Sequence, residues 1–375
     1  MTQAHQNKIP VLLMVRELGI GGSERQLVET ALFLPRDRFV PHVGCFRPDG
    51  LRRPDLDAAN VPVLHLAVSS FKSPAVVTAA AKLMRYIQRH QIQIVHSFDA
   101  PLNAFAVPVA RLVATPAVIS SQRGHRGLTG QTLKRFLRMT DRLADAVVVN
   151  CQAMKQYMVD EEHVPQNKVQ LCYNAVDIDR YRRRKTDGTF AGRLVIGSIC
   201  ALRPEKGLDV LVQAFATVRD LGVKLLLVGS GPEEAHLRTL SASLGIAADC
   251  HFEAATTDVV QWLSQIDIFV LPSRSEALSN SLMEAMACGC CPIASRVGGN
   301  PELVEDGRNG LLFEADNVPE LAARLRELLM DESRRKAFAS ASVAKMSQFT
   351  CERAGQTMQA IYESILNSKH GEGRL

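Results

Sequence analysis

Short apolar runs alternate with amphipathic segments of helical period along almost the whole chain. In the first half, the apolar runs lie at residues 10–15, 40–46, 61–66, 92–96, 117–121 and 146–149. Runs of this length are typical of parallel strands that are buried on both faces. Between the first two runs, residues 24–34 place Leu27, Val28 and Ala31 on one face of a helix. Strands that alternate with such helices predict a doubly wound α/β fold with a parallel sheet.

The same alternation starts again in the second half, with apolar runs at residues 194–199, 224–228, 268–271 and 291–294. A chain of 375 residues is too long for one ordinary core and suits two α/β domains. We therefore expect a Rossmann-like domain over residues 1–186, a second over residues 187–351, and a central cleft that both face. The last helix, within residues 352–375, is predicted to pack back on the first domain. Residues 177–188 are basic without apolar periodicity, which favours a solvated linker.

Composition narrows the class of protein. Hydrophobic residues make up 46% and charged residues 22%, as in ordinary globular proteins. A long apolar stretch at residues 102–114 is broken by Pro108 and Arg111, and it is shorter than the roughly 20 residues of a transmembrane helix. The first residues lack the apolar region of a secretory signal. We expect a cytoplasmic protein without a transmembrane helix.

The cysteine content and the net charge narrow the expected compartment and ligands. Nine cysteines are scattered and odd in number, which favours reduced thiols. Cys288 and Cys291 have a C-x-x-C spacing, but no second pair or nearby histidine completes a zinc site, so a packing role is expected. The net charge of +5 suits a phosphate-bearing substrate or an anionic membrane surface. Only 5% of residues are aromatic, and no base-stacking platform indicates a nucleic-acid binder.

A glycine-rich turn follows the first predicted strand. Gly19, Gly21 and Gly22 precede a predicted helix, whose exposed N–H groups favour an anion such as phosphate. A dinucleotide fingerprint needs a third glycine where Glu24 stands, and no acidic residue ends the next strand. This pattern disfavours a nicotinamide cofactor. A tight turn with Glu24 in the first helical turn explains the motif equally well.

The strongest functional signal follows the third predicted strand of the second domain. There Glu276 lies on a loop, and Glu284 lies one or two turns into the next helix. The N–H groups of Ser279, Asn280 and Ser281 open this helix and could bind a diphosphate, while carboxylates accept hydrogen bonds from sugar or ribose hydroxyls. Either glutamate alone could be a capping or surface residue. The combination of loop, helix start and two acids favours a ligand site.

The two glutamates resemble the E-x7-E signature of family 4 of the retaining glycosyltransferases. Five further segments have the order and spacing of this family, at residues 21–24, 169–177, 204–207, 228–232 and 297–302. The resemblance covers most of the chain. It implies a GT-B fold in which the second domain binds a nucleoside diphosphate sugar and the first binds the acceptor.

The resemblance also implies roles for single residues. Lys206 is expected to neutralise the donor diphosphate, Glu284 to bind the ribose, and Glu276 to contact the transferred sugar. Gly21 and Gly22 would close over the phosphate from the first domain. No metal or other cofactor is expected, because lysine, arginine and helix N-termini can stabilise the charge that develops on the leaving diphosphate.

Two positions depart from the family pattern. Ala201 stands where an arginine usually precedes the phosphate lysine, and Arg203 is the candidate that supplies this charge instead. Gln122 stands where a histidine commonly contacts the reacting sugar, with Arg123 and His125 as acceptor-side candidates. A glutamine donates a hydrogen bond but does not titrate, so the catalytic contact is predicted to differ.

Three other polar features have structural explanations that are at least as good. His96 ends a predicted strand and is as good a candidate for a structural histidine as for a site residue. The D-x-D sequences at residues 55–57 and 177–179 could hold a divalent cation, but we interpret both as loop or linker acids.

Residues 133–143 predict a basic amphipathic helix in the acceptor domain. Such a helix suits anionic lipid head groups and predicts a peripheral contact with the inner face of the membrane. An ordinary helix whose arginines extend their charged ends into water explains it equally well.

The favoured function is retaining transfer of a hexose or related sugar from a UDP- or GDP-linked donor. The expected acceptor is a glycan or lipid-linked saccharide, as in bacterial surface polysaccharide biosynthesis. One alternative is a sugar-nucleotide epimerase on the same fold, which needs acid and base residues converging on the sugar. Another is a degenerate nucleotide-sugar-binding protein, which Ala201 and Gln122 suggest.

Overall fold

The computed structural model describes residues 8–185, 189–190 and 192–372. These residues form two units, one of Met1–Ala175 with Cys351–Leu375 and one of Val176–Thr350. The predicted boundary at residue 186 lies outside the described residues. Residues 176–185 belong to the second unit, although the sequence assigned them to the first domain.

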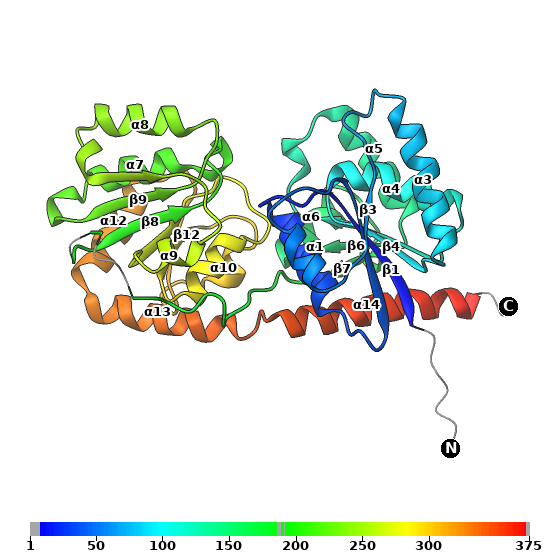
Figure 1. Cartoon of the computed structure of the whole chain (residues 1–375). Helices are drawn as coiled ribbons and strands as arrows, with labels where there is room; N and C mark the ends of the chain where they lie inside the picture. Colours follow the sequence, from blue (N-terminus) through cyan, green and yellow to red (C-terminus); the bar gives the residue numbers. More distant parts are fainter. Residues whose placement is uncertain (1–7, 186–188, 191, 373–375) are drawn as a thin grey trace, which may run out of the picture. The chain divides into compact units, whose positions relative to one another are not determined.

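The first unit is built on a seven-stranded sheet in which all neighbouring strands are parallel (Figure 1). The strand order is β3-β2-β1-β4-β5-β6-β7. The strands are β1 (Ile9–Glu17), β2 (Phe39–Arg47), β3 (Val63–His65), β4 (Ile94–Ser97), β5 (Ala117–Gln122), β6 (Ala146–Val149) and β7 (Val169–Leu171). All six predicted strands are present. The edge strand β7 was not predicted, because its three residues include Gln170 and make no apolar run.

Helices follow the strands of this sheet. They are α1 (Gly22–Phe33), α2 (Arg53–Ala58), α3 (Ala75–Arg89), α4 (Ala100–Leu112), α5 (Gln131–Leu143), α6 (Gln152–Asp160) and α14 (Cys351–Glu372), with short 3-10 helices η1 (Arg126–Leu128) and η2 (Gln166–Lys168). Helix α4 shows how the sequence sets a helix start. Asp99 accepts a hydrogen bond of 2.9 Å from the Leu102 N–H, so its side chain caps the helix.

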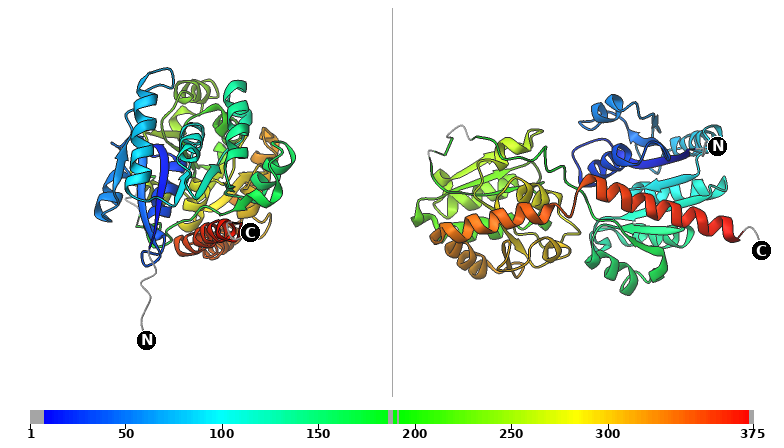
Figure 2. Two further views of the ribbon diagram at one scale, coloured as in Figure 1. Left: turned by 90° about the vertical axis from the view of Figure 1, so that its right-hand side faces the viewer. Right: turned by 90° about the horizontal axis from the view of Figure 1, so that it is seen from below.

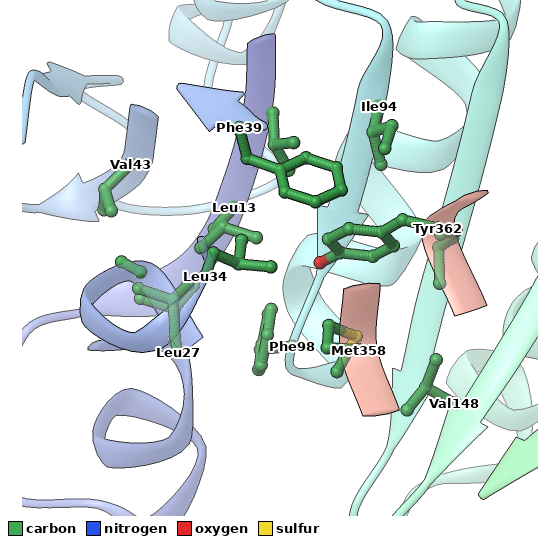
Figure 3. Close-up of a cluster of buried hydrophobic side chains, with 14 of the residues drawn as sticks. Leu13, Leu27, Leu34, Phe39, Val43, Ile94, Phe98, Val148, Met358 and Tyr362 are labelled. Carbon is green, nitrogen blue, oxygen red and sulfur yellow. The ribbon is translucent and has the colours of Figure 1, made fainter. Parts of the chain in front are cut away.

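The C-terminal helix α14 completes the core of the first unit, where it packs against α1 and β5 (Figures 1 and 2). Met358 and Tyr362 of α14 lie among buried side chains from the sheet and α1 (Figure 3). The ring of Tyr362 meets Phe39 edge-on, with 5.9 Å between ring centroids. Its hydroxyl lies 2.7 Å from Nδ1 of the buried His96. This helix therefore belongs to the fold of the first unit although it is last in the sequence.

The second unit contains a six-stranded parallel sheet in the order β10-β9-β8-β11-β12-β13. Its strands are β8 (Val195–Ile199), β9 (Lys224–Val228), β10 (Cys250–Glu253), β11 (Ile268–Leu271), β12 (Cys291–Ser295) and β13 (Leu311–Phe313). The two edge strands, β10 and β13, were not predicted. Strand β10 is only partly buried and β13 has three residues, so neither produces a long apolar run.

Helices of the second unit also alternate with its strands. They are α7 (Leu208–Ala216), α8 (Glu234–Ser243), α9 (Val259–Leu263), α10 (Asn280–Ala287), α11 (Asn300–Leu303), α12 (Val318–Met330) and α13 (Glu332–Met346), with 3-10 helices η3 (Pro204–Lys206), η4 (Arg219–Leu221) and η5 (Ala247–Asp249). The predicted helix at residues 208–220 is thus α7 followed by η4. Both units have the predicted doubly wound architecture.

The segment at 176–185 joins β7 to β8 and exposes most of its charged side chains, as predicted, but it is anchored at several points. The Val176 N–H donates to the Phe349 carbonyl at 2.9 Å, and the Arg184 N–H donates to Ser264 Oγ at 2.9 Å. Between these anchors, Tyr181 is 5% exposed. The buried ring of Tyr181 and ion pairs of Arg183 with Asp267 and of Arg184 with Asp258 attach the segment to the rest of the second unit.

No helix in the described part of the chain is long and apolar enough to cross a membrane. All nine cysteines are free. Cys288 and Cys291 are both buried, at the end of α10 and in β12, which agrees with the packing role predicted for their C-x-x-C spacing.

Candidate functional site

The strand order of the second unit places two loops side by side at one edge of its sheet. Strands β8 and β11 are neighbours, but their connections lead to opposite sides, because β9 lies beyond β8 and β12 lies beyond β11. In open α/β sheets, ligands bind outside the carboxyl ends of the strands at such a switch point. The loop after β8 carries Lys206, and the loop after β11 carries Glu276.

These two predicted residues are in direct contact. Lys206 Nζ lies 2.5 Å from Glu276 Oε1, and the Ser273 hydroxyl donates to the same carboxylate oxygen at 2.8 Å. Both charged side chains are largely buried. The structure therefore brings the predicted phosphate lysine and the predicted sugar carboxylate together at the switch point.

Burial and charge act in opposite directions on Lys206. Burial of the ammonium lowers its pKa, but the negative charge and hydrogen bond of Glu276 raise it, and the net result is a raised pKa. Lys206 is consequently a cation throughout the physiological pH range. A fixed, partly desolvated cation is suited to an anionic ligand such as a diphosphate.

Arg274 joins the two loops that carry Lys206 and Glu276. Its side chain donates to the Pro204 carbonyl, to Asp209 Oδ2 and to Asp316 Oδ1, each at 2.7 Å. Its backbone N–H donates to the Glu205 carbonyl at 2.8 Å. The loop after β11 is thereby held against the loop after β8. Sequence analysis did not single out Arg274, because its partners lie far away along the chain.

Two glycines let the surrounding loops approach this pair closely. Gly207 has a φ of +62°, and a Cβ atom there would lie 2.2 Å from the Pro272 carbonyl oxygen. Gly298 has a φ of +51°, and a Cβ atom there would lie 2.0 Å from the Glu276 carbonyl oxygen. Any other side chain would clash with backbone in a conformation that favours glycine. These contacts explain the glycines in two of the segments that resemble the family.

Helix α10 begins directly after the Glu276 loop. Ser279 is its N-cap, accepting from the Leu282 N–H at 3.4 Å and lying 3.2 Å from the Ser281 hydroxyl, and Asn280 is the first helical residue. One turn further, Glu284 is 9% exposed and accepts a hydrogen bond of 3.0 Å from the Tyr181 hydroxyl. The structure thus places Glu284 in the helix as predicted, with a tyrosine partner that the sequence did not reveal.

Arg203, the predicted substitute for the arginine that Ala201 replaces, makes fewer close contacts than Lys206. Arg203 is 63% exposed, and its guanidinium lies 3.9 Å from Glu205 Oε1. Ala201 is also exposed. Arg203 lies on the loop after β8, as Lys206 does, but its side chain is not fixed in the way that Lys206 is.

In the first unit, the glycine turn lies at the end of β1, with Gly21 as the N-cap of α1 and Gly22 as its first residue. The carboxylate of Glu24 lies over this turn. It is so close that a Cβ atom on Gly21 would be only 2.1 Å from Glu24 Oε2. Burial raises the pKa of Glu24, and the nearby Asp99 carboxylate adds to this effect. The position expected to attract a phosphate is therefore occupied by the chain's own carboxyl group.

Gln122 ends β5, at the carboxyl edge of the first sheet. Its Nε2 donates to the Gly124 carbonyl at 2.5 Å, and its Oε1 accepts from Arg126 Nε at 3.0 Å. The side chain is buried and supports the loop that follows. The amide nitrogen and the amide oxygen of this predicted catalytic residue thus both make structural hydrogen bonds.

The neighbouring acceptor-side candidates differ in their surroundings. Arg123 lies over the Phe98 ring at 4.9 Å and donates to Asn174 Oδ1 at 2.8 Å, and burial lowers its pKa to about 10. His125 packs edge-on against Tyr157, and burial lowers its pKa. Arg123 and His125 both lie on the loop that directly follows Gln122.

His96 is a structural histidine. Its Nδ1 lies 2.7 Å from the Tyr362 hydroxyl and its Nε2 lies 2.8 Å from Ser121 Oγ. Burial holds its pKa well below the usual value, so the ring is neutral.

The two D-x-D sequences are engaged in local contacts. Asp57 pairs with Arg53 at 2.8 Å within α2, so residues 55–57 are helical and the loop interpretation was wrong for them. Asp179 pairs with Arg182 at 2.6 Å, and Asp177 accepts from a nearby backbone N–H.

A buried ionic network that no sequence pattern reveals supports the loop that follows Gln122. Arg126 is fully buried and makes two hydrogen bonds to Asp141, of 2.7 and 3.0 Å. Glu162 is also buried and accepts from Tyr157 at 2.7 Å and from Arg138 at 2.8 Å. A fully buried arginine needs such partners to offset its lost hydration.

Two family descriptions match consecutive parts of the chain. Residues 20–180 match the family described as Glycosyltransferase Family 4. Residues 179–344 match the family described as Glycosyl transferases group 1. Together the two matches include every candidate residue named above.

The chain is also similar to individual proteins over most of their length. N-acetyl-alpha-D-glucosaminyl L-malate synthase from Bacillus anthracis is 28% identical over 316 residues, which is 80% of this chain and 82% of that protein. A GDP-mannose-dependent alpha-(1-6)-phosphatidylinositol monomannoside mannosyltransferase from Mycobacterium tuberculosis is 28% identical over 285 residues, 70% of this chain and 74% of that protein.

Solved structures share the fold. HepE from Anabaena, crystallised with UDP and glucose, matches with a TM-score of 0.85 and 23% identity, over 94% of this chain and 99% of that one. Sucrose-phosphate synthase from Thermosynechococcus elongatus matches with a TM-score of 0.81 and 16% identity, over 96% of this chain and 100% of that one. These likenesses show a GT-B architecture of two Rossmann-like domains.

Proposed function

The chain belongs to glycosyltransferase family 4, and from this premise we propose that it moves a sugar from a nucleoside diphosphate sugar to an acceptor hydroxyl. Members of this family are retaining enzymes with the GT-B fold. The proposed acceptor is a glycan or lipid-linked saccharide, as in bacterial surface polysaccharide assembly. The observation that carries the proposal is the contact between Lys206 and Glu276 at the switch point of the second sheet.

Each site residue has a proposed role in donor binding. Lys206 neutralises the diphosphate, and the N-terminus of α10 at Ser279, Asn280 and Ser281 adds N–H donors and a favourable dipole. Arg203 is a further cation for the same group. These groups stabilise the negative charge that develops on the leaving diphosphate.

The carboxylates bind the neutral parts of the donor. Glu276 accepts hydrogen bonds from hydroxyls of the transferred sugar, and Glu284 accepts them from the ribose. The glycine turn at Gly21 and Gly22 is proposed to bind an anion once the Glu24 carboxylate has moved aside. Arg123 and His125 contribute to the acceptor side, and Gln122 is proposed as the catalytic contact at the position where a histidine commonly meets the reacting sugar.

The proposed chemistry is front-face transfer with retention. The bond between the anomeric carbon and the phosphate oxygen breaks, and the acceptor oxygen forms a bond to the same face of that carbon. The acceptor proton passes to the departing phosphate oxygen, so no protein base is required. Lys206 is close to the phosphate in this arrangement and stabilises it as the charge grows.

The relatives leave the nucleotide open between two bases. One is named as GDP-mannose-dependent, and HepE was crystallised with UDP. A thermal-shift screen with UDP, GDP and their sugars distinguishes them, because a ligand that binds the native protein raises its Tm. Transfer is then measured with the sugar nucleotide that gives the largest shift, using a panel of saccharide acceptors.

Incubation with the sugar nucleotide that gives the largest Tm shift distinguishes the proposed function from the two alternatives. In the absence of acceptor, a transferase releases at most slow hydrolysis products, whereas an epimerase makes a new sugar nucleotide. A degenerate binding protein raises its Tm with a nucleotide but transfers to no acceptor in the panel. Absence of any Tm shift with UDP, GDP or their sugars contradicts the proposal itself.

We further propose that transfer needs no metal. Lys206 and the α10 N-terminus supply the positive charge that a divalent cation provides in other transferases. The rate in excess EDTA is expected to equal the rate with added Mg²⁺ or Mn²⁺. A loss of transfer in EDTA that either metal restores contradicts this.

Helix α5 is the proposed contact with the inner face of the membrane. Its exposed apolar side chains are Phe136, Met139 and Leu143, at 39%, 42% and 37% exposure. Arg135 and Arg142 are exposed beside them. This combination of apolar and basic side chains suits an anionic lipid surface.

Two basic residues of α5 already make ion pairs within the protein. Lys134 and Arg138 both pair with Glu162, at 3.1 and 2.8 Å. Arg135 and Arg142 are therefore the better candidates to meet lipid head groups.

Flotation with phosphatidylcholine vesicles, with and without phosphatidylglycerol, tests this contact. Binding to the anionic vesicles is expected for the wild type and lost when Arg135 and Arg142 are both changed to Glu. The matched control changes Arg85 and Arg89 of α3 to Glu and is expected to keep binding. Equal flotation of all three proteins contradicts the α5 contact.

A further inference from the structure

Tyr181 makes a hydrogen bond to a predicted donor-binding residue from an unexpected part of the chain. It lies in the segment between β7 and β8, and its hydroxyl donates to Glu284 Oε1 at 3.0 Å. The same segment is anchored on both sides of Tyr181, by the backbone of Val176 and of Arg184. The phenol is therefore presented to Glu284 from a fixed backbone.

Glu284 is a buried carboxylate on a buried part of α10. Residues Leu282 to Ala287 of this helix are all buried. A carboxylate in such surroundings needs a hydrogen-bond donor, because burial without one is costly. The bond from Tyr181 meets this need and also fixes the orientation of the carboxylate, since the donor is rigid and directional.

A nucleotide ligand makes the orientation of this carboxylate important. A carboxylate has two oxygens and about four acceptor positions, so the bond to Tyr181 leaves acceptor capacity for ribose hydroxyls. A group that is already oriented pays less entropy when the ligand binds. We propose that Tyr181 is a positioning residue that orients Glu284 toward the ribose of the donor nucleotide, an inference that rests on the proposed function.

The experiment compares ribose with its deoxygenated form. Dissociation constants are measured by calorimetry for UDP and GDP and for the 2′,3′-dideoxy form of each, with wild type and Tyr181→Phe. The Phe variant keeps the ring and removes only the hydroxyl. Affinity for the preferred ribonucleotide is expected to fall about 5- to 20-fold, with affinity for its dideoxy form unchanged.

Kinetics and a second variant separate positioning from mere structure. In Tyr181→Phe, KM for the donor is expected to rise by the same factor while kcat changes less than about twofold. Glu284→Gln is expected to lose the same ribose discrimination. Adding Tyr181→Phe to it should cost little more, because both changes remove one coupled interaction.

Tyr157 provides a matched control within the chain. Its hydroxyl donates to the buried Glu162 at 2.7 Å, and its exposure is 7% against 5% for Tyr181. Tyr157→Phe removes the same kind of hydrogen bond in the first unit. It is expected to lower Tm and to leave the ratio of ribo to dideoxy affinity unchanged.

Three results are informative. If the folded Tyr181→Phe protein keeps the wild-type ribose discrimination, the inference is wrong while the proposed function stands. If it loses affinity for ribo and dideoxy forms equally, Tyr181 stabilises the unit without orienting Glu284, and the inference is again wrong. If wild type binds none of these nucleotides, the proposed function fails before Tyr181 is tested.

Discussion

Lys206 Nζ and Glu276 Oε1 lie 2.5 Å apart although the residues are 70 positions apart in the sequence. They meet because β8 and β11 are neighbours and both loops leave the same edge of the sheet. Without a ligand, the lysine charge is already paired with a carboxylate. A bound diphosphate must therefore share Lys206 with Glu276 or displace it.

This pairing predicts opposite effects on binding for two substitutions. Glu276→Gln frees the lysine charge, so affinity for the nucleoside diphosphate is expected to stay equal or to rise up to about tenfold. Transfer is expected to fall at least about 100-fold, because the sugar contact is lost. Lys206→Ala is expected to weaken nucleotide affinity by about 10- to 100-fold. Calorimetry and initial rates measure both, and weaker nucleotide binding in both variants contradicts the shared-lysine arrangement.

Substitution of Arg274 is expected to reduce activity, although Arg274 has no proposed contact with the ligand. Arg274→Met removes the bonds to Pro204, Asp209 and Asp316 and lets the two site loops separate. Small displacements of catalytic groups are costly, so kcat/KM is expected to fall by about 10- to 100-fold. Steady-state kinetics with the preferred donor measure this loss.

The control for this variant is Arg238→Met. Arg238 pairs with Glu234 of α8, and its guanidinium lies over the ring of Phe252 in β10. Its removal is expected to change kcat/KM less than twofold. An equal effect of both substitutions shows that Arg274 acts through general stability.

Glu162 predicts a specific loss of stability in acid. Burial alone raises its pKa, but hydrogen bonds from Arg138, Tyr157 and Lys134 outweigh this and lower it to about 2. A carboxylate with a lowered pKa stabilises the fold above its unfolded pKa, and this stability is lost as pH falls from about 4.5 toward 2. Its size is of order 3 kcal/mol, since one pKa unit corresponds to about 1.4 kcal/mol.

Urea denaturation at several pH values from 7 to 3 tests this expectation. The Glu162→Gln protein should be less stable at pH 7, with a shallower decline of stability between pH 5 and 3. The only tryptophan, Trp262, lies in the second unit, so its fluorescence follows that unit while circular dichroism follows both. A change in the Trp262 transition as large as the change in circular dichroism contradicts a local effect. Glu305→Gln is the control, because Glu305 pairs with Lys345 on the surface.

Tyr362 predicts how strongly α14 is attached to the first unit. Tyr362→Phe removes the hydrogen bond to His96 and is expected to cost about 1 to 2 kcal/mol, because a buried ring nitrogen loses its partner. Tyr362→Ala also leaves a cavity beside Phe39 and is expected to cost about 3 to 5 kcal/mol. Urea denaturation followed by circular dichroism measures both costs. An unchanged transition in the Ala variant contradicts the role of α14 in this core.

The sequence predicted the architecture well because buried parallel strands are long apolar runs. It failed for β7, β10 and β13, which are short edge strands with little or no such run. Residues 176–185 are mostly exposed, as their charges predicted, but the burial of Tyr181 among them was missed. Burial of Tyr181 depends on its partner Glu284, which no local pattern reveals.

For the site, Lys206, Glu276 and Glu284 of the second unit could be named in advance, but their contacts and the roles of Arg274 and Tyr181 could not. Lys206 and Glu276 were identified by their spacing within separate motifs, whereas their pairing depends on strand order. Arg274 lies between predicted site residues, but its role appears only in its four partners, which lie in η3, in α7 and at Asp316. Glu24 was placed in the first helical turn, and only the structure shows its carboxylate lying over Gly21.

The attachment of α14 has a consequence for synthesis on the ribosome. The second unit is one continuous stretch, Val176–Thr350, and all of it is made before α14. The first unit begins earlier but lacks Met358 and Tyr362 of its core until α14 is made. The half that emerges first is thus completed last, and its apolar surface beside α1 stays uncovered while the other half folds. We therefore expect chaperones to bind the exposed apolar surface of the first unit rather than the second unit during synthesis.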